Sequence, residues 1–266
     1  MQLLLGFLLA FLIAFLAYCA RSLSLSGTCA AILVGTVIFG LGGIPWAVLL
    51  LTFFVSSSAL TRAFARQKSA LSDKFAKGGQ RDAGQVLANG AVAALFAGLH
   101  FFFPEADWPW LAFAGSLAAV SADTWATELG VLNPTPPRLI TNGKVVEKGA
   151  SGAVSLLGML SALAGAALIA VLAAALTPSI QHTLFTSQFL LITLSGLLAS
   201  LFDSLLGASV QAIYHCPACN KETERHPVHL CGAATVQIRG WKWLDNDRVN
   251  LACATMGATV ALLFFL

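Results

Sequence analysis

Charge is scarce in this sequence. Only 10% of its 266 residues are Asp, Glu, Lys or Arg, whereas 58% are hydrophobic, and the mean hydropathy is +0.81. Soluble domains carry about 25% charged residues, so this composition excludes an ordinary soluble globular protein. It predicts an all-α, polytopic membrane helix bundle that has the lipid bilayer as a partner.

The signals of several other protein classes are also absent. No basic residue precedes the apolar N-terminal stretch, so we expect this stretch to be a true span and not a signal peptide. The Walker pattern GxxxxGK followed by Ser or Thr does not occur, and neither does another nucleotide-binding fingerprint. Cys19, Cys29 and Cys253 lie in or beside apolar runs, where a thiol behaves as a small hydrophobic group, so they predict no disulfide framework.

Eight apolar runs are long enough to cross the hydrocarbon core of a bilayer as helices. They cover residues 2–19, 28–43, 44–61, 84–103, 108–130, 153–176, 184–210 and 249–266, and only the segment GLGGIP separates the second run from the third. We therefore expect a single integral membrane domain over residues 1–266. Residues 212–248 would form a cytoplasmic loop between the last two spans.

Lys and Arg are confined to one face of the predicted bundle. If eight spans alternate in direction, all fifteen basic residues fall on one side, and the positive-inside rule makes it the cytoplasmic side of a bacterial-type inner membrane, plasma membrane or equivalent. Both termini are then expected on the opposite side, where Trp46, Trp108 and Trp110 would form an aromatic belt. A basic cytoplasmic face suits anionic headgroups and phosphorylated ligands. No nucleic acid is expected as a partner, and a homo-oligomer stays an open alternative.

Three acidic residues lie in or at the ends of the predicted spans: Asp123, Glu128 and Asp203. A carboxylate at the centre of a bilayer costs roughly 2.5–3.5 kcal/mol on insertion scales, so such groups usually face a cavity, a partner or an ion. Asp123 and Asp203 lie on different helices, and each is followed by a hydroxyl residue, Thr124 or Ser204. We predict that the two aspartates hold Mg²⁺, with the hydroxyl groups beside it.

Simpler interpretations of these carboxylates remain open. Asp123 could pair with a Lys or Arg from a loop, Asp203 could cap a broken helix, and Glu128 could lie in the headgroup zone. Residues five apart also lie about 140° apart around an ideal helix. Asp123 and Glu128 could therefore share an ion only if the helix unwinds or a second ligand bridges them.

Two basic loops are candidates for phosphate binding. In GGQRDAGQVLANG, residues 78–90, Arg81, Gln85 and Asn89 follow one side of the fourth span, where hydrogen bonding between helices is the alternative role. In PRLITNGKVVEKGASG, residues 137–152, NGK is an ordinary hairpin turn, and GASG is predicted to open the sixth span and to expose backbone N–H groups to an anion. The residues of this second loop that are expected to bind phosphate are Arg138, Asn142, Lys144, Lys148, Gly149, Ser151 and Gly152.

Together these features are what a phosphoryl- or nucleotidyl-transfer site requires. A divalent cation bridges the phosphates, basic side chains neutralise the developing charge, and positioning does most of the rest. Mg²⁺ usually takes one or two carboxylates together with substrate oxygens, which fits the small number of acids in the spans.

A compact group of cysteine and histidine residues lies between the last two spans. It begins with a Cys-x2-Cys pair, and the spacing of the residues that follow is enough to complete a tetrahedral site for structural Zn²⁺. The expected ligands are Cys216, Cys219, His229 and Cys231, with His226 and His215 as alternates. A reduced redox pair, or cysteines without a metal, are the other interpretations. The polar start of the last span, with Asp245, Asn246, Asp247 and Asn250, could also line the phosphate site.

The chain resembles one known family in six ordered motifs: GGQRDAGQVLANG, SADTWATELG, PRLITNGKVVEKGASGAVSLLG, LFDSLLGASVQ, CPACNKETER with HLCG, and WLDNDRVN. The resemblance runs through nearly the whole chain and is to the integral-membrane family catalogued as domain of unknown function 92. That family includes transmembrane protein 19 and the plant phytyl-phosphate kinase of vitamin E salvage.

This resemblance implies a kinase that converts an isoprenoid monophosphate into its diphosphate, with a nucleoside triphosphate such as CTP or ATP as the donor. On this hypothesis Asp123 and Asp203 hold Mg²⁺ across the donor phosphates, and Glu128 and Lys144 belong to the same catalytic group. The basic loops bind the phosphates, and the prenyl tail lies between helices in the hydrocarbon. The acceptor phosphate is already an anion, so no strong general base is required.

Three other functions stay open. A transporter or flippase for a prenyl phosphate would need polar groups along a path through both leaflets. A nucleotidyltransferase of the CDP-alcohol type would usually carry a DG-rich signature, which is missing here. A zinc-dependent scaffold would leave the two aspartates in the spans unexplained.

Overall fold

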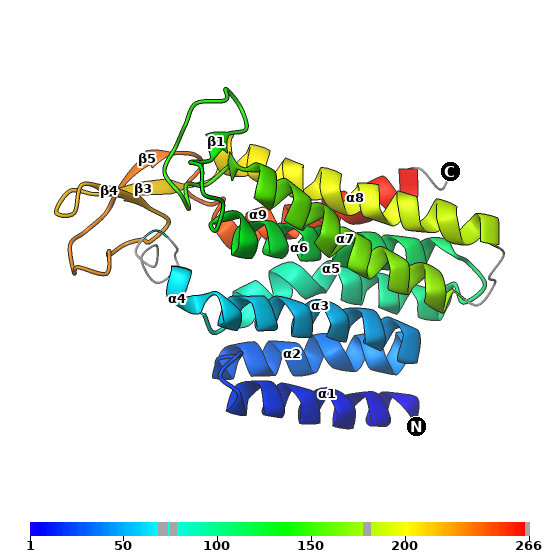
Figure 1. The fold of residues 1–266 in the computed structure, drawn as a ribbon. Coiled ribbons are helices and arrows are strands. Elements are labelled where there is room, and N and C mark those ends of the chain that lie inside the picture. Colours follow the sequence, from blue (N-terminus) through cyan, green and yellow to red (C-terminus); the bar gives the residue numbers. More distant parts are fainter. Residues whose placement is uncertain (69–73, 75–78, 178–181, 264–266) are drawn as a thin grey trace.

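Long helices run side by side in one bundle, and short strands gather at one end of it (Figure 1). The computed structural model describes residues 1–68, 74, 79–177 and 182–263. The helices are α1 (Gln2–Cys19), α2 (Leu25–Val37) with the π-helical turn η1 (Ile38–Gly42), α3 (Ile44–Ala63), α4 (Ala65–Lys68), α5 (Ala83–Phe102), α6 (Trp108–Gly130), α7 (Leu156–Leu176), α8 (His182–Ser209) and α9 (Asn246–Leu263).

The long helices follow the predicted spans closely, which confirms the all-α membrane fold. By length and composition, six helices of the described chain can cross a membrane, namely α1, α2 with η1, α3, α5, α7 and α8. Helices α6 and α9 carry more polar residues and lie among these six in the bundle (Figure 1). The last residues of the final predicted span, 264–266, lie outside the described residues.

Helix α6 is the most deeply buried helix at the centre of the bundle. Its residues 109–122 are all buried. Glycines let neighbouring backbones approach it, because a Cβ on Gly115 would lie 2.6 Å from the carbonyl oxygen of Gly257 in α9. A Cβ on Gly196 of α8 would similarly lie 2.9 Å from the carbonyl oxygen of Ala118. Membrane helices associate through such small residues, and here they bring the acidic segments of α6 and α8 side by side.

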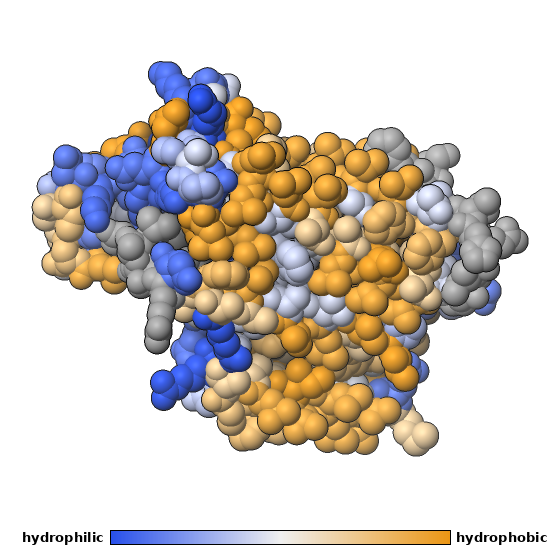
Figure 2. Space-filling model, viewed as in Figure 1, coloured by the Kyte–Doolittle hydropathy of each residue, from blue (hydrophilic) through white to orange (hydrophobic). Residues whose placement is uncertain are grey.

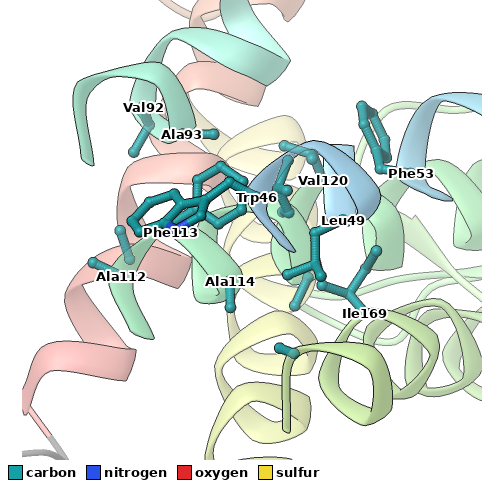
Figure 3. Close-up of a cluster of buried hydrophobic side chains, with 14 of the residues drawn as sticks. Trp46, Leu49, Phe53, Val92, Ala93, Ala112, Phe113, Ala114, Val120 and Ile169 are labelled. Atoms are coloured by element: carbon teal, nitrogen blue, oxygen red, sulfur yellow. The ribbon is translucent and has the colours of Figure 1, made fainter. Parts of the chain in front are cut away.

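An aromatic cluster fills the core between α3 and α6 (Figure 3). The ring centroids of Trp46 and Phe113 are 4.5 Å apart, and Trp110 packs edge-on against Trp46 at 5.2 Å. Trp46 and Trp110 are only 4% and 9% exposed, so their prediction as an aromatic belt is wrong. They are buried because Trp46 packs against His100 of α5 and against Trp110 and Phe113 of α6, a helix that has other helices around it.

The two ends of the bundle differ in polarity. The chain begins and ends at one end, and the strands lie at the other (Figure 1). Hydrophilic residues gather over the strand end, whereas hydrophobic residues cover the visible sides of the helices (Figure 2). Both termini therefore lie at the same end, as an even number of spans requires. Which side of the membrane each end faces stays a prediction.

Two small antiparallel sheets form the strand end. Strand β1 (Arg138–Leu139) pairs with β2 (Ala153–Val154), and β3 (Ile213–Cys216), β4 (Lys221–Thr223) and β5 (Val236–Arg239) form a sheet in the order β4-β3-β5. The predicted NGK turn is present, with Gly143 at a φ of +69° and the Leu139 N–H donating to the carbonyl of Lys144 at 2.9 Å. The three-stranded sheet was not predicted, because strands of three or four residues leave little alternation in the sequence.

The segment GASG does not open a helix, so that prediction is wrong. Helix α7 begins at Leu156, and its N-cap is Ser155, whose hydroxyl accepts a hydrogen bond from the Gly158 N–H at 3.1 Å. A serine hydroxyl satisfies an N–H group that glycine would leave unpaired, which is why the helix starts there. Gly152 instead has a φ of +78° and lies so close to α8 that a Cβ would come within 2.3 Å of the Ala208 nitrogen.

Candidate active site

A cavity of about 790 Å³ opens at the strand end of the bundle. Its walls come from the ends of α3, α6 and α8, the starts of α5 and α9, the segment that precedes α7, and the loop that contains the cysteines. The carboxylates that line it are Asp123, Glu128, Asp203, Glu224, Asp245 and Asp247, and the basic residues are Arg81, Lys148, Arg225 and Lys242. Charge is thus concentrated where the sequence predicted phosphate chemistry.

Asp123 and Asp203 face this cavity from α6 and α8. They lie close enough for the charge of Asp123 to act on Asp203, on which the charge of Glu224 also acts. The Oδ2 atom of Asp203 is buried and accepts no hydrogen bond, and Asp123 has no hydrogen bond or ion pair in the described chain. Helix α8 continues through Asp203 without a break. The structure therefore supports neither pairing of Asp123 with a basic residue nor capping by Asp203.

Glu128 lies in another part of the same cavity. It is 6% exposed, and its Oε1 accepts a hydrogen bond from the hydroxyl of Thr61 in α3 at 2.9 Å. The charge of Glu128 also acts on Arg81. Glu128 is therefore buried, with Thr61 and Arg81 among its polar neighbours, and its level relative to the membrane headgroups stays a prediction.

Backbone hydrogen bonds to a neighbouring loop hold Arg81 in place. Its N–H donates to the carbonyl of Ser22 and its carbonyl accepts from the Ser24 N–H, both at 3.0 Å, so the residue pairs with the loop between α1 and α2. The guanidinium lies 5.7 Å and 5.6 Å from the ring centroids of Phe53 and Phe54. A fixed backbone and two aromatic faces aim a cation at the junction of the polar end and the hydrocarbon.

The predicted polar stripe on α5 is present. Asp82 caps the helix by accepting from the Gln85 N–H at 3.0 Å, while the Gln85 side chain accepts from the Asp82 N–H. This capping box was missed in the sequence, although Asp followed three residues later by Gln is its signal. Gln85 and Asn89 both line the cavity together with Arg81.

The segment 148–152 forms a wall of the cavity through contacts with α8 and the cysteine loop. The Ser151 hydroxyl donates to Oε1 of Gln211 at 2.7 Å, and Nε2 of Gln211 donates to Oε1 of Glu224 at 2.9 Å. Gln211 is 2% exposed. The amide oxygen of Gln211 thus bonds to the glycine-rich turn and its amide nitrogen bonds to Glu224, so this buried side chain fixes the turn relative to Glu224. Thr124 and Ser204 also line the cavity, as predicted.

Three predicted phosphate ligands do not reach the cavity: Arg138, Asn142 and Lys144. Arg138 donates to the carbonyl of Gly143 at 2.9 Å, and Asn142 accepts from the Lys144 N–H at 3.0 Å, so these residues stabilise their own turn. The turn projects beyond the bundle beside β1 (Figure 1). A turn fixed by internal hydrogen bonds thus holds these three residues outside the lining of the cavity, and their role in binding phosphate stays a prediction.

Three charged residues of the cavity were not predicted: Glu224, Arg225 and Lys242. All three belong to the loop 212–248, which the sequence suggested only as a metal-binding support. No spacing motif marks them. Their position depends on the sheet β4-β3-β5, which the sequence did not reveal.

The predicted metal ligands come together. One donor atom each from Cys216, Cys219, His229 and Cys231 lies within 4.8 Å of the others. Two of the sulfur atoms, on Cys216 and Cys231, are 3.5 Å apart, and Nδ1 of His229 lies 3.3 Å and 3.6 Å from the sulfurs of Cys231 and Cys219. A tetrahedral Zn²⁺ with Zn–S bonds of about 2.3 Å holds sulfurs about 3.8 Å apart, so this donor set fits zinc.

The thiols of this cluster differ in pKa. A hydrogen bond with His229 lowers the pKa of Cys231 to about 6, whereas a hydrogen bond with Cys231 raises the pKa of Cys219 to about 11. One thiolate is thus favoured beside a thiol that donates to it. The alternate ligands lie elsewhere, because His226 stacks on Tyr214 at 4.5 Å and His215 contacts Asn220.

Lys74 joins the cysteine loop to the wall of the cavity. Its carbonyl accepts from the Glu224 N–H at 2.9 Å, and its ammonium group lies 2.6 Å from Oε2 of Glu147 and 3.1 Å from the carbonyl of Lys148. Lys74 therefore holds Glu224, whose charge acts on Asp203, beside the segment that carries Glu147 and Lys148.

Known proteins resemble this chain over most of its length. The family model described as integral membrane protein DUF92 matches residues 8–258. Protein PGR of Arabidopsis thaliana is 34% identical, over 94% of this chain and 91% of that protein. An uncharacterized membrane protein of Methanocaldococcus jannaschii is 32% identical, over 92% and 87%. Protein VTE6, chloroplastic, of Arabidopsis thaliana is 28% identical, over 91% of this chain and 65% of that protein. No solved structure matches the chain.

Proposed function

Since the chain belongs to the DUF92 family of integral membrane proteins, we propose that it is a kinase that transfers a phosphoryl group from a nucleoside triphosphate to a phytyl or related prenyl monophosphate in the bilayer. The observation that carries this proposal is the pair Asp123 and Asp203. Their carboxylates lie near each other in a polar cavity, and neither is neutralised by a described basic residue.

The two aspartates fit a hard divalent cation such as Mg²⁺. They offer carboxylate oxygens from different helices, and the Oδ2 of Asp203 is buried without a hydrogen-bond donor. Mg²⁺ prefers such oxygens and keeps its other positions for water and substrate phosphate. When bound, it would supply positive charge to the phosphate oxygens. Without a cation, two like charges this close are unfavourable.

The basic residues divide into two groups around this pair. Arg81 lies at the hydrocarbon side of the cavity, where we place the acceptor monophosphate. Lys148, Arg225 and Lys242 lie toward the strand end, where a soluble nucleotide would enter from the cytoplasm. The backbone of the turn at 149–152 adds N–H groups that would bind the donor phosphates.

The reaction needs alignment more than it needs a base. An oxygen of the acceptor phosphate forms a bond to the γ-phosphorus as the bond from that phosphorus to the β–γ bridging oxygen breaks, and a nucleoside diphosphate leaves. The attacking oxygen is already anionic. The residues of the cavity hold the two phosphates in line and neutralise the charge that moves to the leaving oxygen.

The position of the charges favours an enzyme over a carrier. The basic residues that line the cavity all come from the strand end. At the opposite end the core around α6 is mainly apolar, and its polar contacts are local, such as the hydrogen bonds from Trp110 to Thr177 and from Thr177 to Gln188. A carrier would need a polar path through that half also.

The test uses two radioactive labels on the nucleotide. Purified protein in detergent receives Mg²⁺, a panel of phytyl, geranylgeranyl and shorter prenyl monophosphates, and CTP or ATP labelled on either the α- or the γ-phosphate. We expect the γ-label, and not the α-label, in a prenyl diphosphate. Transfer of the α-label would identify a nucleotidyltransferase, and binding of the lipid without transfer of either label would contradict the kinase.

A further inference from the structure

A second, apolar cleft adjoins the polar cavity. It lies between α1, α2, α3 and α5, and its volume is about 80 Å³ against about 790 Å³ for the cavity. The two spaces share three lining residues: Arg81, Gln85 and Asn89. Every other residue that lines the cleft is Ala, Gly, Val, Leu, Ile or Phe.

We infer that this cleft binds the hydrocarbon chain of a lipid monophosphate and that Arg81 holds its phosphate at the entrance to the polar cavity. This inference rests on the proposed function, since the lipid is the acceptor in that reaction. The cleft is narrow, so it holds the part of the chain next to the headgroup. The remainder of the chain would extend into the bilayer.

Small residues create the space for a chain. The inward face of α1 carries Ala10, Ala14 and Ala17 at helical spacing, whereas its large side chains are exposed toward lipid. Opposite them, Gly35 in α2 and Gly90 in α5 line the same cleft. A Cβ on Gly90 would already lie 3.0 Å from a methyl carbon of Val34. A larger residue at 90 would therefore fill the cleft.

Arg81 gives the cleft one positively charged end. The side chain donates to the hydroxyl of Ser58 at 3.4 Å, a long hydrogen bond, and its flat faces meet two phenylalanine rings. A guanidinium has five N–H donors and matches a phosphate with two of them at once. An amphiphile with one anionic head and one apolar chain matches this arrangement. Glu128 already acts on Arg81 from the polar cavity, so a phosphate at the cleft would be a second anion beside this cation, and a neutral lipid would supply none.

The direct test is photocrosslinking, which requires no turnover. The probe is farnesyl monophosphate with a diazirine on its second isoprene unit, and farnesol with the same diazirine is its control. We expect the phosphate probe to label peptides from α1, α2, α3 and α5, and unlabelled farnesyl monophosphate to compete. Labelling of α7, α8 or α9, or equal labelling by the alcohol, would overturn the inference.

Substitutions sharpen the same test. Arg81→Gln should reduce labelling by the phosphate probe about tenfold, because it removes charged hydrogen bonds, while Arg81→Lys should retain part of it. Gly90→Leu should reduce labelling by the phosphate probe at least about tenfold, because its side chain would occupy the cleft. Gly98→Leu is the matched control on α5, because nothing lies within 4 Å of a Cβ there, and it should be labelled like the wild type. Equal labelling of the Gly90 and Gly98 variants would contradict the cleft.

The outcomes separate the two proposals. If no nucleotide yields a diphosphate but the cleft is labelled as expected, the kinase fails and the lipid site stands. If the diphosphate forms but the label appears on other helices, the kinase stands and the cleft is not its lipid site.

Discussion

Two groups of residues in this protein could hold a metal ion, and they differ in almost every respect. The four cysteine and histidine donors converge within 4.8 Å, enough ligands for a tetrahedral ion, whereas Asp123 and Asp203 provide two carboxylates in a wide cavity. A site whose positions are all filled by protein can support a structure, and a site with open positions can bind substrate. If both groups bind metal, the comparison predicts a structural ion in the cysteine loop and a separate ion that takes part in the chemistry of the cavity.

We expect the largest effect from substitutions of Asp123 and Asp203, the group with open coordination positions. Asp123→Asn or Asp203→Asn should reduce kcat about 10²–10³-fold, because each removes a charged ligand at the place where phosphate charge develops. Thermal stability should not fall, because the substitution relieves repulsion between like charges. The γ-label assay and a melting curve in detergent measure the two quantities.

The control is Asp107→Asn, at the other end of α6, where the side chain makes no capping hydrogen bond. It should behave as wild type in both assays. A variant of Asp123 that lost stability in proportion to its activity would instead show that the carboxylate has a structural role.

The next largest effect is expected from substitutions in the cysteine and histidine cluster. Cys216→Ser should lower zinc affinity at least about 100-fold, and stability and activity should fall together, because the loop carrying Glu224 and Arg225 loses its support. Metal content measured by mass spectrometry should drop from about one zinc per chain. Cys29→Ser, at an exposed cysteine outside the cluster, is the control. Normal activity in zinc-free protein would refute this link.

The smallest expected effect is on the KM for the nucleotide, and it distinguishes residues that line the cavity from residues of the turn 139–144 beside it. Arg225→Gln should raise the KM for the nucleotide about tenfold, because a charged hydrogen bond to phosphate is lost. Lys144→Gln should change it less than about twofold, because the turn that carries Lys144 lies outside the cavity. Steady-state kinetics with both variants decide this. A larger effect at Lys144 would restore the role first expected for it.

The helices and the acidic pair could be predicted because each leaves a local signal. An apolar run long enough for a bilayer, or a carboxylate inside such a run, is visible in the sequence alone. The same holds for the cysteine cluster, whose ligands lie within sixteen residues, 216–231.

The features that could not be predicted from the sequence share one physical cause, because tertiary packing determines each of them. Trp46 of α3 is buried because it packs against aromatic residues of α5 and α6. Lys144 lies outside the lining of the cavity because internal hydrogen bonds fix the turn that carries it. Glu224 and Arg225 reach the cavity through short strands that leave no periodic pattern. In each case the local residues are compatible with more than one placement, and contacts far along the chain select one.

Binding of Mn²⁺, followed by electron paramagnetic resonance in the presence of a non-hydrolysable nucleotide, tests the shared role of the two aspartates most directly. Wild-type protein and the Asp107→Asn variant should bind the ion with the same affinity, and each of the Asp123→Asn and Asp203→Asn variants should bind it at least about tenfold more weakly. Unchanged Mn²⁺ affinity in either aspartate variant would contradict a cation held between α6 and α8.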